Sequence, residues 1–318
     1  MILCVGIAVC DVLVKPVSEE TLARDTTRAD FVRLLGGGDA FNAAGNMAAL
    51  GAKVRLVSGV GRDELGDLLR GSLSRQGVEA RLVEKDAPTS AAAVLIRPDG
   101  ERSFVSFRGA SHQLAEPDIP DAAFEGAGFM YVGSAFGLPG LDGEGMARLM
   151  ARAKAAGLVT ALDATNEMSQ EHLEPFSHVL KNVDIFLPSL REARSLTGCD
   201  RPIDAARVFA SLGPQTVVVK CGAQGCVALS EGKEYASPGF PAEVVDTTGA
   251  GDAFVSGFLA AREKGYGLSD CLTYANAAGA VCVGKVGASG TLRNFEELER
   301  MTRTRSMRED AQNGGAQV

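Results

Sequence analysis

The sequence lacks the features that mark membrane, secreted and nucleic-acid-binding proteins. No run approaches the ~18 apolar residues that span a bilayer, and the N-terminus lacks the basic segment of a signal peptide. Acidic residues outnumber basic ones, with 40 Asp and Glu against 32 Lys and Arg and a formal net charge of -8. Nucleic-acid binders instead collect Lys and Arg. We therefore expect a cytoplasmic protein with no nucleic-acid and no membrane partner.

Disulfide and metal motifs are missing as well. The seven cysteines are an odd number, none form a Cys-x-x-Cys pair, and no His-Glu-x-x-His spacing occurs. Several cysteines lie in apolar runs, where cysteine behaves as a small hydrophobe. Such usage is typical of reduced, buried thiols in a cytoplasmic protein rather than of a disulfide framework or a zinc site.

The composition that is present is that of an ordinary globular protein. The 318 residues are 46% hydrophobic and 23% charged, without internal repeats or low-complexity linkers. This length allows one large domain with an appendage, or two domains.

Short apolar runs alternate with helical patterns along most of the chain. In segments 63–76 and 143–156, Leu or Met recurs at helical spacing and a glycine follows. Apolar runs typical of buried strands occupy 2–9, 53–60, 129–133, 159–164, 183–188, 216–221 and 226–230. This alternation predicts an α/β fold: a three-layer, doubly wound, mostly parallel sheet with helices on both faces.

Two segments, 11–35 and 89–108, depart from the alternation. The β-like stretches 91–96 and 103–107 flank Pro98-Asp99-Gly100, a sequence that favours a tight turn. We expect both segments to form a small β-sheet that projects from the core. The core itself would comprise 1–10, 36–88 and 109–302 and bind nucleotide and substrate, and the polar segment 303–318 would be a flexible tail.

One segment carries the pattern of phosphoryl-transfer chemistry. Gly249, Ala250 and Gly251 open a helical run, so their N–H groups and the positive end of the helix dipole can hold an anion. Asp252 follows directly and can accept the proton of an attacking hydroxyl. The alternative is an acidic first-turn residue after a simple tight turn. No Lys follows the glycines, so this is not a Walker A loop.

A second glycine cluster, Gly36–Gly38, also opens a helical run. Asn42 stands one turn further on, and its amide offers both a donor and an acceptor to a hydroxyl. The alternative is a plain helix start with an internal polar residue. Two glycine-rich helix openings, one with an acid and one with an amide, favour a substrate site more than either does alone.

These residues resemble a known family. The segment from Asp246 to Phe254 resembles the C-terminal signature of the ribokinase-like (PfkB) carbohydrate kinases, and Gly37-Gly38 with Asn42 resembles the N-terminal one. The resemblance extends from about residue 2 to about residue 292 and is to the bacterial sugar kinase type. It implies an ATP-dependent sugar kinase that uses Mg²⁺, with K⁺ as an option, and a β-sheet lid that pairs two subunits into a homodimer.

The resemblance also implies roles for individual residues. Asp252 is the catalytic base, and the anion hole comprises Gly249, Ala250 and Gly251. The sugar contacts are Asp11, Gly37, Gly38 and Asn42. The nucleotide contacts are Lys220, Gly222, Gly225 and Asn276. Glu192 helps to hold Mg²⁺ through water, and Asp246 and Thr248 are the candidates for holding a monovalent cation.

Two positions depart from the family pattern. Ser189 stands where the family often has Asn, three residues before Glu192. Asp39 stands where several relatives, including those that act on phosphorylated sugars, carry Lys. An acid there repels a substrate phosphate, so we expect an unphosphorylated substrate.

Other charged residues are weaker candidates for the site. Arg102 and Arg108 lie on the expected hairpin, where one of them can reach the substrate, although an exposed edge strand also carries charges simply to block aggregation. Asp163 ends an apolar strand, and the carboxyl ends of parallel strands line the ligand crevice of such sheets.

Three alternative functions stay open. A nucleoside kinase of the same family would differ only in the acceptor. A sugar-binding regulator would have lost catalysis and would not need Asp252. A nicotinamide-dependent oxidoreductase is disfavoured, because Gly59-Val60-Gly61 is followed by Glu64 instead of the third glycine of the dinucleotide fingerprint.

Overall fold

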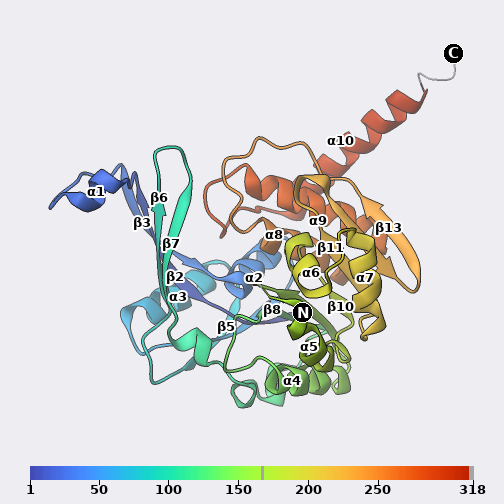
Figure 1. The fold of residues 1–318 in the computed structure, drawn as a ribbon, viewed down its shortest axis with the longest axis horizontal. Coiled ribbons are helices and arrows are strands. Elements are labelled where there is room, and N and C mark those ends of the chain that lie inside the picture. Colours follow the sequence, from blue (N-terminus) through green and yellow to red (C-terminus); the bar gives the residue numbers. More distant parts are fainter. Residues whose placement is uncertain (166–167, 315–318) are drawn as a thin grey trace.

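The computed structural model describes residues 1–165 and 168–314, with side chains up to residue 304. It contains a nine-stranded sheet in the order β13-β12-β11-β10-β9-β8-β1-β4-β5 and a four-stranded sheet in the order β3-β2-β6-β7 (Figure 1). The strands of the large sheet are β1 (Ile2–Val5), β4 (Val54–Val60), β5 (Glu79–Glu84), β8 (Phe129–Ala135), β9 (Val159–Ala164), β10 (Ile185–Phe186), β11 (Thr216–Lys220), β12 (Cys226–Ser230) and β13 (Lys233–Ser237). Only β12 and β13 run antiparallel to their neighbours, so the predicted mostly parallel sheet is confirmed.

The four-stranded sheet forms the lid. Its strands are β2 (Val9–Lys15), β3 (Phe31–Gly37), β6 (Ala91–Ile96) and β7 (Arg102–Phe107), and a short helix α1 (Glu19–Ala23) lies between β2 and β3. The β6–β7 hairpin is the one expected around Pro98-Asp99-Gly100. In Figure 1 the far end of this sheet projects from the core, whereas its base lies beside the core helices.

Helices cover both faces of the large sheet. They are α2 (Asp39–Ala49), α3 (Glu64–Arg75), α4 (Glu144–Ala155), α5 (Leu173–Leu180), α6 (Leu190–Thr197), α7 (Pro202–Ser211), α8 (Ala250–Glu263), α9 (Leu268–Val283) and α10 (Phe295–Gly314). One apolar core joins the sheet to α2, α3, α8 and α9, and a second joins it to α4, α5, α6 and α7. The three-layer, doubly wound architecture is therefore confirmed.

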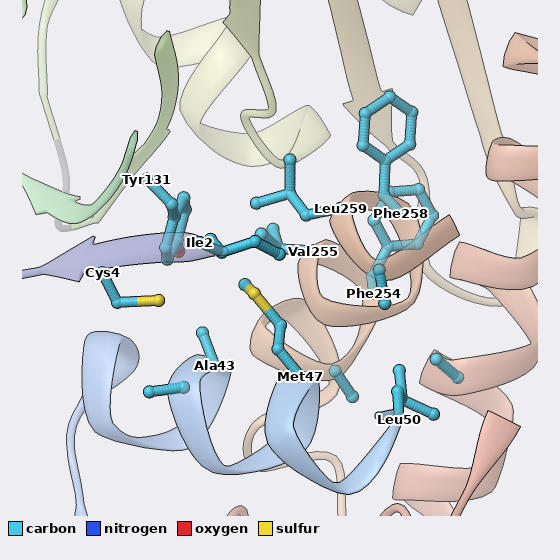
Figure 2. Packing of buried hydrophobic residues seen from close by; sticks show 14 of the residues in the cluster. Ile2, Cys4, Ala43, Met47, Leu50, Tyr131, Phe254, Val255, Phe258 and Leu259 are labelled. Carbon is cyan, nitrogen blue, oxygen red and sulfur yellow. The ribbon is translucent and has the colours of Figure 1, made fainter. Parts of the chain in front are cut away.

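Strand β1 contributes side chains to both apolar cores. Ile2 and Cys4 belong to the first core and Leu3 to the second, because successive side chains of a strand point to opposite faces. Figure 2 shows Ile2 above Met47 of α2 and beside Val255 of α8. Each such fully buried aliphatic side chain stabilises the fold by about 1.5–3 kcal/mol.

Helix α8 is buried between two neighbours, and this fixes its N-terminus. Its residues from Ala253 to Ala261 are all buried. A Cβ at Gly257 would lie 2.7 Å from the carbonyl oxygen of Tyr274 in α9, so α8 and α9 approach closely because position 257 has no side chain. The first turn of α8, with Asp252, is therefore held on a rigid element.

The order of the strands locates the ligand crevice. The chain passes from β1 to β4 and β5 on one side and then returns to β8 on the other side of β1. Ligands of such sheets bind at this reversal, outside the carboxyl ends of the strands. The lid rises from the same edge, because β2 follows β1 after three residues.

The structure differs from the sequence-based expectations in two of the expected strands. The run 2–9 is divided at Gly6, where a Cβ would lie 2.9 Å from the Cβ of Ala40, and the chain leaves the large sheet there for the lid. Only Ile185–Phe186 of the expected strand 183–188 is extended. Of the segment expected to be a flexible tail, 303–318, helix α10 includes the part up to Gly314, and 315–318 lie outside the described residues. No helix within the described ranges is long and apolar enough to cross a membrane.

Candidate active site

The proposed anion hole lies at the N-terminus of α8. Gly249 is the residue before the helix and has φ +75°, and a Cβ there would lie 2.4 Å from the Cβ of Ala288. Both the backbone conformation and the space therefore demand glycine. The N–H of Ala250 donates to the carbonyl of Thr247 at a long 3.3 Å. The first-turn N–H groups of a helix have no partner within the helix and remain available for an anion.

Asp252 and Asn42 are brought into contact from 210 positions apart. The Asn42 amide nitrogen donates to Oδ2 of Asp252 at 2.9 Å. Asn42 is buried, and its Oδ1 has no hydrogen-bond partner in the structure. The two glycine-rich helix openings therefore meet, and the amide oxygen of Asn42 is an acceptor that no group of the described chain uses.

A cavity of about 410 Å³ opens in front of Asp252. Its floor includes Asp11, Gly38 and Asn42, and its roof includes Phe104 and Ser106 of the lid strand β7. All of the predicted sugar contacts except Gly37 line this cavity. The lid therefore forms one wall of this cavity.

Gly37 and Gly38 make room for the groups around them. A Cβ at Gly37 would lie 2.1 Å from Oδ2 of Asp11, and a Cβ at Gly38 would lie 2.5 Å from the carbonyl oxygen of Ile7. Gly37 therefore acts through the position of Asp11. Burial raises the pKa of Asp11 to about 6, while the positive charge of Arg102 acts in the opposite direction.

A second cavity, of about 300 Å³, lies on the other side of the anion hole. All four predicted nucleotide contacts, Lys220, Gly222, Gly225 and Asn276, are among its lining residues. Apolar side chains that include Phe240, Val244 and Phe254 form the rest of its wall, which suits a flat base. Gly251 borders both cavities.

Two of the predicted nucleotide contacts, Gly225 and Asn276, also pack against Ser237 at the wall of the second cavity. Gly225 has φ +91°, and a Cβ there would lie 2.1 Å from the carbonyl oxygen of Ser237. The amide nitrogen of Asn276 donates to that same carbonyl at 3.0 Å and to the Ser237 hydroxyl at 3.0 Å. Asn276 therefore fixes the end of β13, in addition to bordering the cavity.

A buried ion pair lies at the second cavity, which Lys220 borders. Lys220 Nζ lies 2.5 Å from Oδ2 of Asp163, and both side chains are largely buried. Burial opposes the charged amine, yet Asp163 and Glu192 raise the pKa of Lys220. Burial raises the pKa of Asp163 to about 7 against the pull of Lys220.

The pKa of Asp252 is raised well above the ordinary range. The causes are burial and the negative charges of Asp39 and Asp163, while the hydrogen bond from Asn42 and the charge of Lys220 act in the opposite direction. A base whose pKa lies nearer to neutrality is better suited to accept a hydroxyl proton.

Asp39 borders the first cavity, the one in front of Asp252, and its side chain also has a hydrogen-bond partner. Its Oδ2 accepts a hydrogen bond from the Ser134 hydroxyl at 2.5 Å. Ser134 has φ +69°, a backbone conformation that non-glycine residues rarely adopt. Ser134 lies in an apolar strand without a motif, so no signal in the sequence pointed to it.

Ser189 and Glu192 form a reciprocal cap at the start of α6. The Ser189 N–H donates to Oε2 of Glu192 at 2.7 Å, and the Glu192 N–H donates to the Ser189 hydroxyl at 3.3 Å. This capping box satisfies two backbone donors and holds the glutamate carboxylate in place. The serine that departs from the family pattern therefore positions Glu192.

Asp246 and Thr248 lie together at the entrance to the anion-hole loop. Oδ1 of Asp246 accepts the N–H of Thr248 at 2.9 Å. Arg102 of the lid contacts both residues, donating Nη1 to the Thr248 hydroxyl at 2.7 Å and Nη2 to Oδ2 of Asp246. Of the two lid arginines considered from the sequence, Arg102 thus binds the core, and Arg108 borders the substrate cavity.

The sequence is similar to those of known sugar kinases. The sequence matches the pfkB family of carbohydrate kinases over residues 1–294. It is 31% identical to fructokinase-2 of Zea mays over 276 residues, 81% of this chain and 82% of that protein. It is 28% identical to the ribokinase of Haemophilus influenzae over 268 residues, 82% of this chain and 85% of that protein.

The fold is also found among solved structures. A ribokinase II from E. coli in complex with ATP and Mg²⁺ has a TM-score of 0.81 to this structure at 24% sequence identity, covering 95% of this chain and 99% of that one. The match to the family model spans both signatures and the whole α/β core. The chain therefore belongs to the pfkB family of carbohydrate kinases, phosphotransferases that act on an alcohol group of the acceptor.

Proposed function

We propose that this ATP-dependent sugar kinase transfers the γ-phosphoryl group of Mg-ATP to a hydroxyl of an unphosphorylated sugar, with Asp252 as the base. The observation that carries this proposal is the meeting of two cavities at Gly251, with Asp252 on the substrate side and Lys220 on the nucleotide side. A nucleotide in one cavity and a sugar in the other would bring the γ-phosphate and the hydroxyl together at the N-terminus of α8.

Each site residue would have a separate role in phosphoryl transfer. Asp252 takes the proton of the hydroxyl as that oxygen attacks the γ-phosphorus, and the bond from this phosphorus to the bridging oxygen breaks so that ADP leaves. The N–H groups of Gly249, Ala250 and Gly251 stabilise the negative charge on the phosphoryl oxygens in flight. Lys220 adds a positive charge beside Gly251, since a Cβ on that glycine would lie 3.6 Å from its Nζ.

The residues around Glu192 fit a bound Mg²⁺. This ion is usually held in kinases by one or two carboxylates, by the phosphates and by water. Glu192 is a single carboxylate near Lys220, and its cap with Ser189 fixes its position. We propose that it holds a water of the ion, which neutralises charge on the phosphates when bound.

Charge in the substrate cavity favours an uncharged acceptor. Asp11, Asp39 and Asp252 border it, and their carboxylates would repel a phosphate on the substrate. The sugars named for two relatives, fructose and ribose, are therefore the first to test. Arg108 lines another part of the wall, and its positive charge makes a sugar acid the second candidate acceptor.

The proposed homodimer would form through the lid. Exposed apolar side chains gather on two of its strands, with Val32 and Leu34 on β3 and Val105 on β7. Such a patch is typical of an interaction surface. Val32→Asp should convert a dimer into a monomer in analytical ultracentrifugation, whereas Val286→Asp, at an exposed valine outside the lid, should leave the dimer intact. A wild-type monomer at micromolar concentration contradicts this assignment.

The cytoplasm remains the proposed location. All seven cysteines are free thiols in this structure, and five of them are buried. Reduced thiols persist in the cytoplasm.

The direct test is ADP formation from Mg-ATP with a panel of free sugars, sugar acids, phosphosugars and nucleosides. Turnover on a free sugar supports the proposal. Preference for fructose 6-phosphate over the free sugars would overturn the assignment of an unphosphorylated substrate, and preference for a nucleoside would favour a nucleoside kinase. Binding of a sugar in calorimetry without ADP formation on any acceptor would favour a regulator.

A further inference from the structure

The lid residue Arg102 occupies the place expected for a monovalent cation. It is the first residue of β7, and its guanidinium forms two hydrogen bonds, to Thr248 and to Asp246. The Arg102 side chain is 13% exposed and that of Asp246 is 3% exposed. An ion pair this well shielded from water is screened little by salt.

The oxygen atoms that would coordinate a cation already accept hydrogen bonds. Oδ2 of Asp246 accepts the N–H of Gly287 at 2.6 Å as well as Arg102. Its Oδ1 accepts the N–H of Thr248, and the Thr248 carbonyl accepts the thiol of Cys282 at 3.5 Å. A cation at this place would face N–H donors and a guanidinium, so these residues do not fit a bound K⁺.

We infer that Arg102 replaces the monovalent cation with a fixed positive charge and thereby ties the lid to the anion-hole loop. This inference rests on the proposed kinase function of the same site. Asp246 lies three residues before Gly249 and Thr248 directly before it, so a group that fixes both of them also fixes the start of the anion hole. The planar guanidinium, with donors in a rigid fork, orients two acceptors at once.

The position of Arg102 in its strand links the substrate cavity to this contact. Arg102, Phe104 and Ser106 are two residues apart and therefore share one face of β7. Phe104 and Ser106 line the substrate cavity, and Arg102 at the start of the strand binds the core. The same strand therefore covers the substrate and holds the loop that stabilises the transferred phosphoryl group.

The test compares salts and variants. Turnover and thermal unfolding are measured in KCl and in tetramethylammonium chloride at equal ionic strength, for the wild type, Arg102→Ala, Arg102→Lys and the control Arg97→Ala. Arg97 lies on the same hairpin, is about half exposed, and forms ion pairs with Asp99 and Glu101 at 3.8 and 3.6 Å. The control removes the same charge without touching the anion-hole loop.

The inference predicts that wild type and Arg97→Ala have the same turnover and the same melting temperature in both salts. In tetramethylammonium chloride, Arg102→Ala should lose about 10- to 100-fold in kcat, because a loosened site is costly. KCl should restore part of this loss and raise the melting temperature of this variant, since K⁺ can enter the space that the guanidinium leaves. Arg102→Lys keeps a positive charge at this position and should remain insensitive to K⁺. If Arg102→Ala does not fold, this variant still tests whether the charge excludes the cation.

Two results would overturn the inference. One is activation or thermal stabilisation of the wild type by K⁺, because a cation would then bind beside Arg102. The other is an Arg102→Ala variant that matches the wild type in both measurements. If no acceptor supports turnover, the proposed function fails, and the melting temperatures still decide whether Arg102 excludes the cation.

Discussion

The side-chain amide of Asn42 donates to Oδ2 of Asp252 at 2.9 Å, and this bond joins the first turns of α2 and α8. It links the two glycine-rich helix openings of the sequence at the place where the substrate and nucleotide cavities meet. The bond also favours the ionised form of Asp252, whereas Asp39 disfavours it. Together with burial, the largest cause of the raised pKa, these two neighbours would set the pH at which Asp252 could act as the proposed base.

Removing either neighbour should shift the acidic limb of the pH profile of kcat/KM in a predictable direction. Protonated Asp252 cannot accept a proton, so kcat/KM falls as the pH drops through its pKa. Asp39→Asn removes a negative neighbour, which lowers that pKa and moves the limb to lower pH. Asn42→Leu removes a donor to the carboxylate, which raises the pKa and moves the limb to higher pH.

The control for these pH profiles is Asp67→Asn, which removes the same charge from an exposed position on α3. Its profile should match that of the wild type. Limbs that move in the same direction for Asp39→Asn and Asn42→Leu would contradict the assignment of Asp252 as the titrating group.

Gly37→Ala should weaken sugar binding through Asp11. The added methyl group would lie 2.1 Å from Oδ2 of Asp11, so this carboxylate must move. We expect KM for the sugar to rise by about tenfold or more, as for the loss of a hydrogen bond to a charged group, with KM for ATP unchanged. Gly128→Ala, where the added methyl group meets nothing within 4 Å, should leave both values unchanged. A rise in KM for ATP alone would contradict the assignment of Asp11.

The Lys220–Asp163 pair should contribute to stability and activity in separable ways. Lys220→Met leaves a buried carboxylate without its partner, which should lower the free energy of unfolding by about 3 kcal/mol. Lys220→Met with Asp163→Asn removes both charges and should recover most of that loss, as measured by urea unfolding. Phosphoryl transfer should stay low in both variants, because Lys220 faces the nucleotide cavity. Recovery of activity together with stability would mean that Lys220 is only structural.

The parts of the fold and site that local sequence patterns encode were predictable. Buried strands and amphipathic helices have distinct periodicities, so the α/β alternation and the β6–β7 hairpin follow from the sequence. Asp252 and Asn42 each stand in a local glycine-rich motif that marks a helix opening. Such motifs carry their chemistry within about ten residues, and no knowledge of the fold is needed to find them.

Contacts between distant segments were not predictable, because they depend on how the sheets pack. Arg102 and Asp246 are 144 positions apart, and Ser134 and Asp39 are 95 apart. No local pattern distinguishes Arg102 from a solvent-exposed arginine on an edge strand. The break between β1 and β2 at Gly6 also depends on packing, since the glycine is required by its distance to Ala40.

The measurement that tests the central claim most directly is single-turnover phosphoryl transfer by Asp252→Asn, combined with calorimetric binding of the sugar. Asparagine keeps the shape of the side chain and an acceptor for Asn42, but it cannot take up the hydroxyl proton. The account predicts that phosphoryl transfer slows by about 10²- to 10⁴-fold while the affinity for the sugar is retained. Transfer at the wild-type rate by this variant would contradict the assignment of Asp252 as the base.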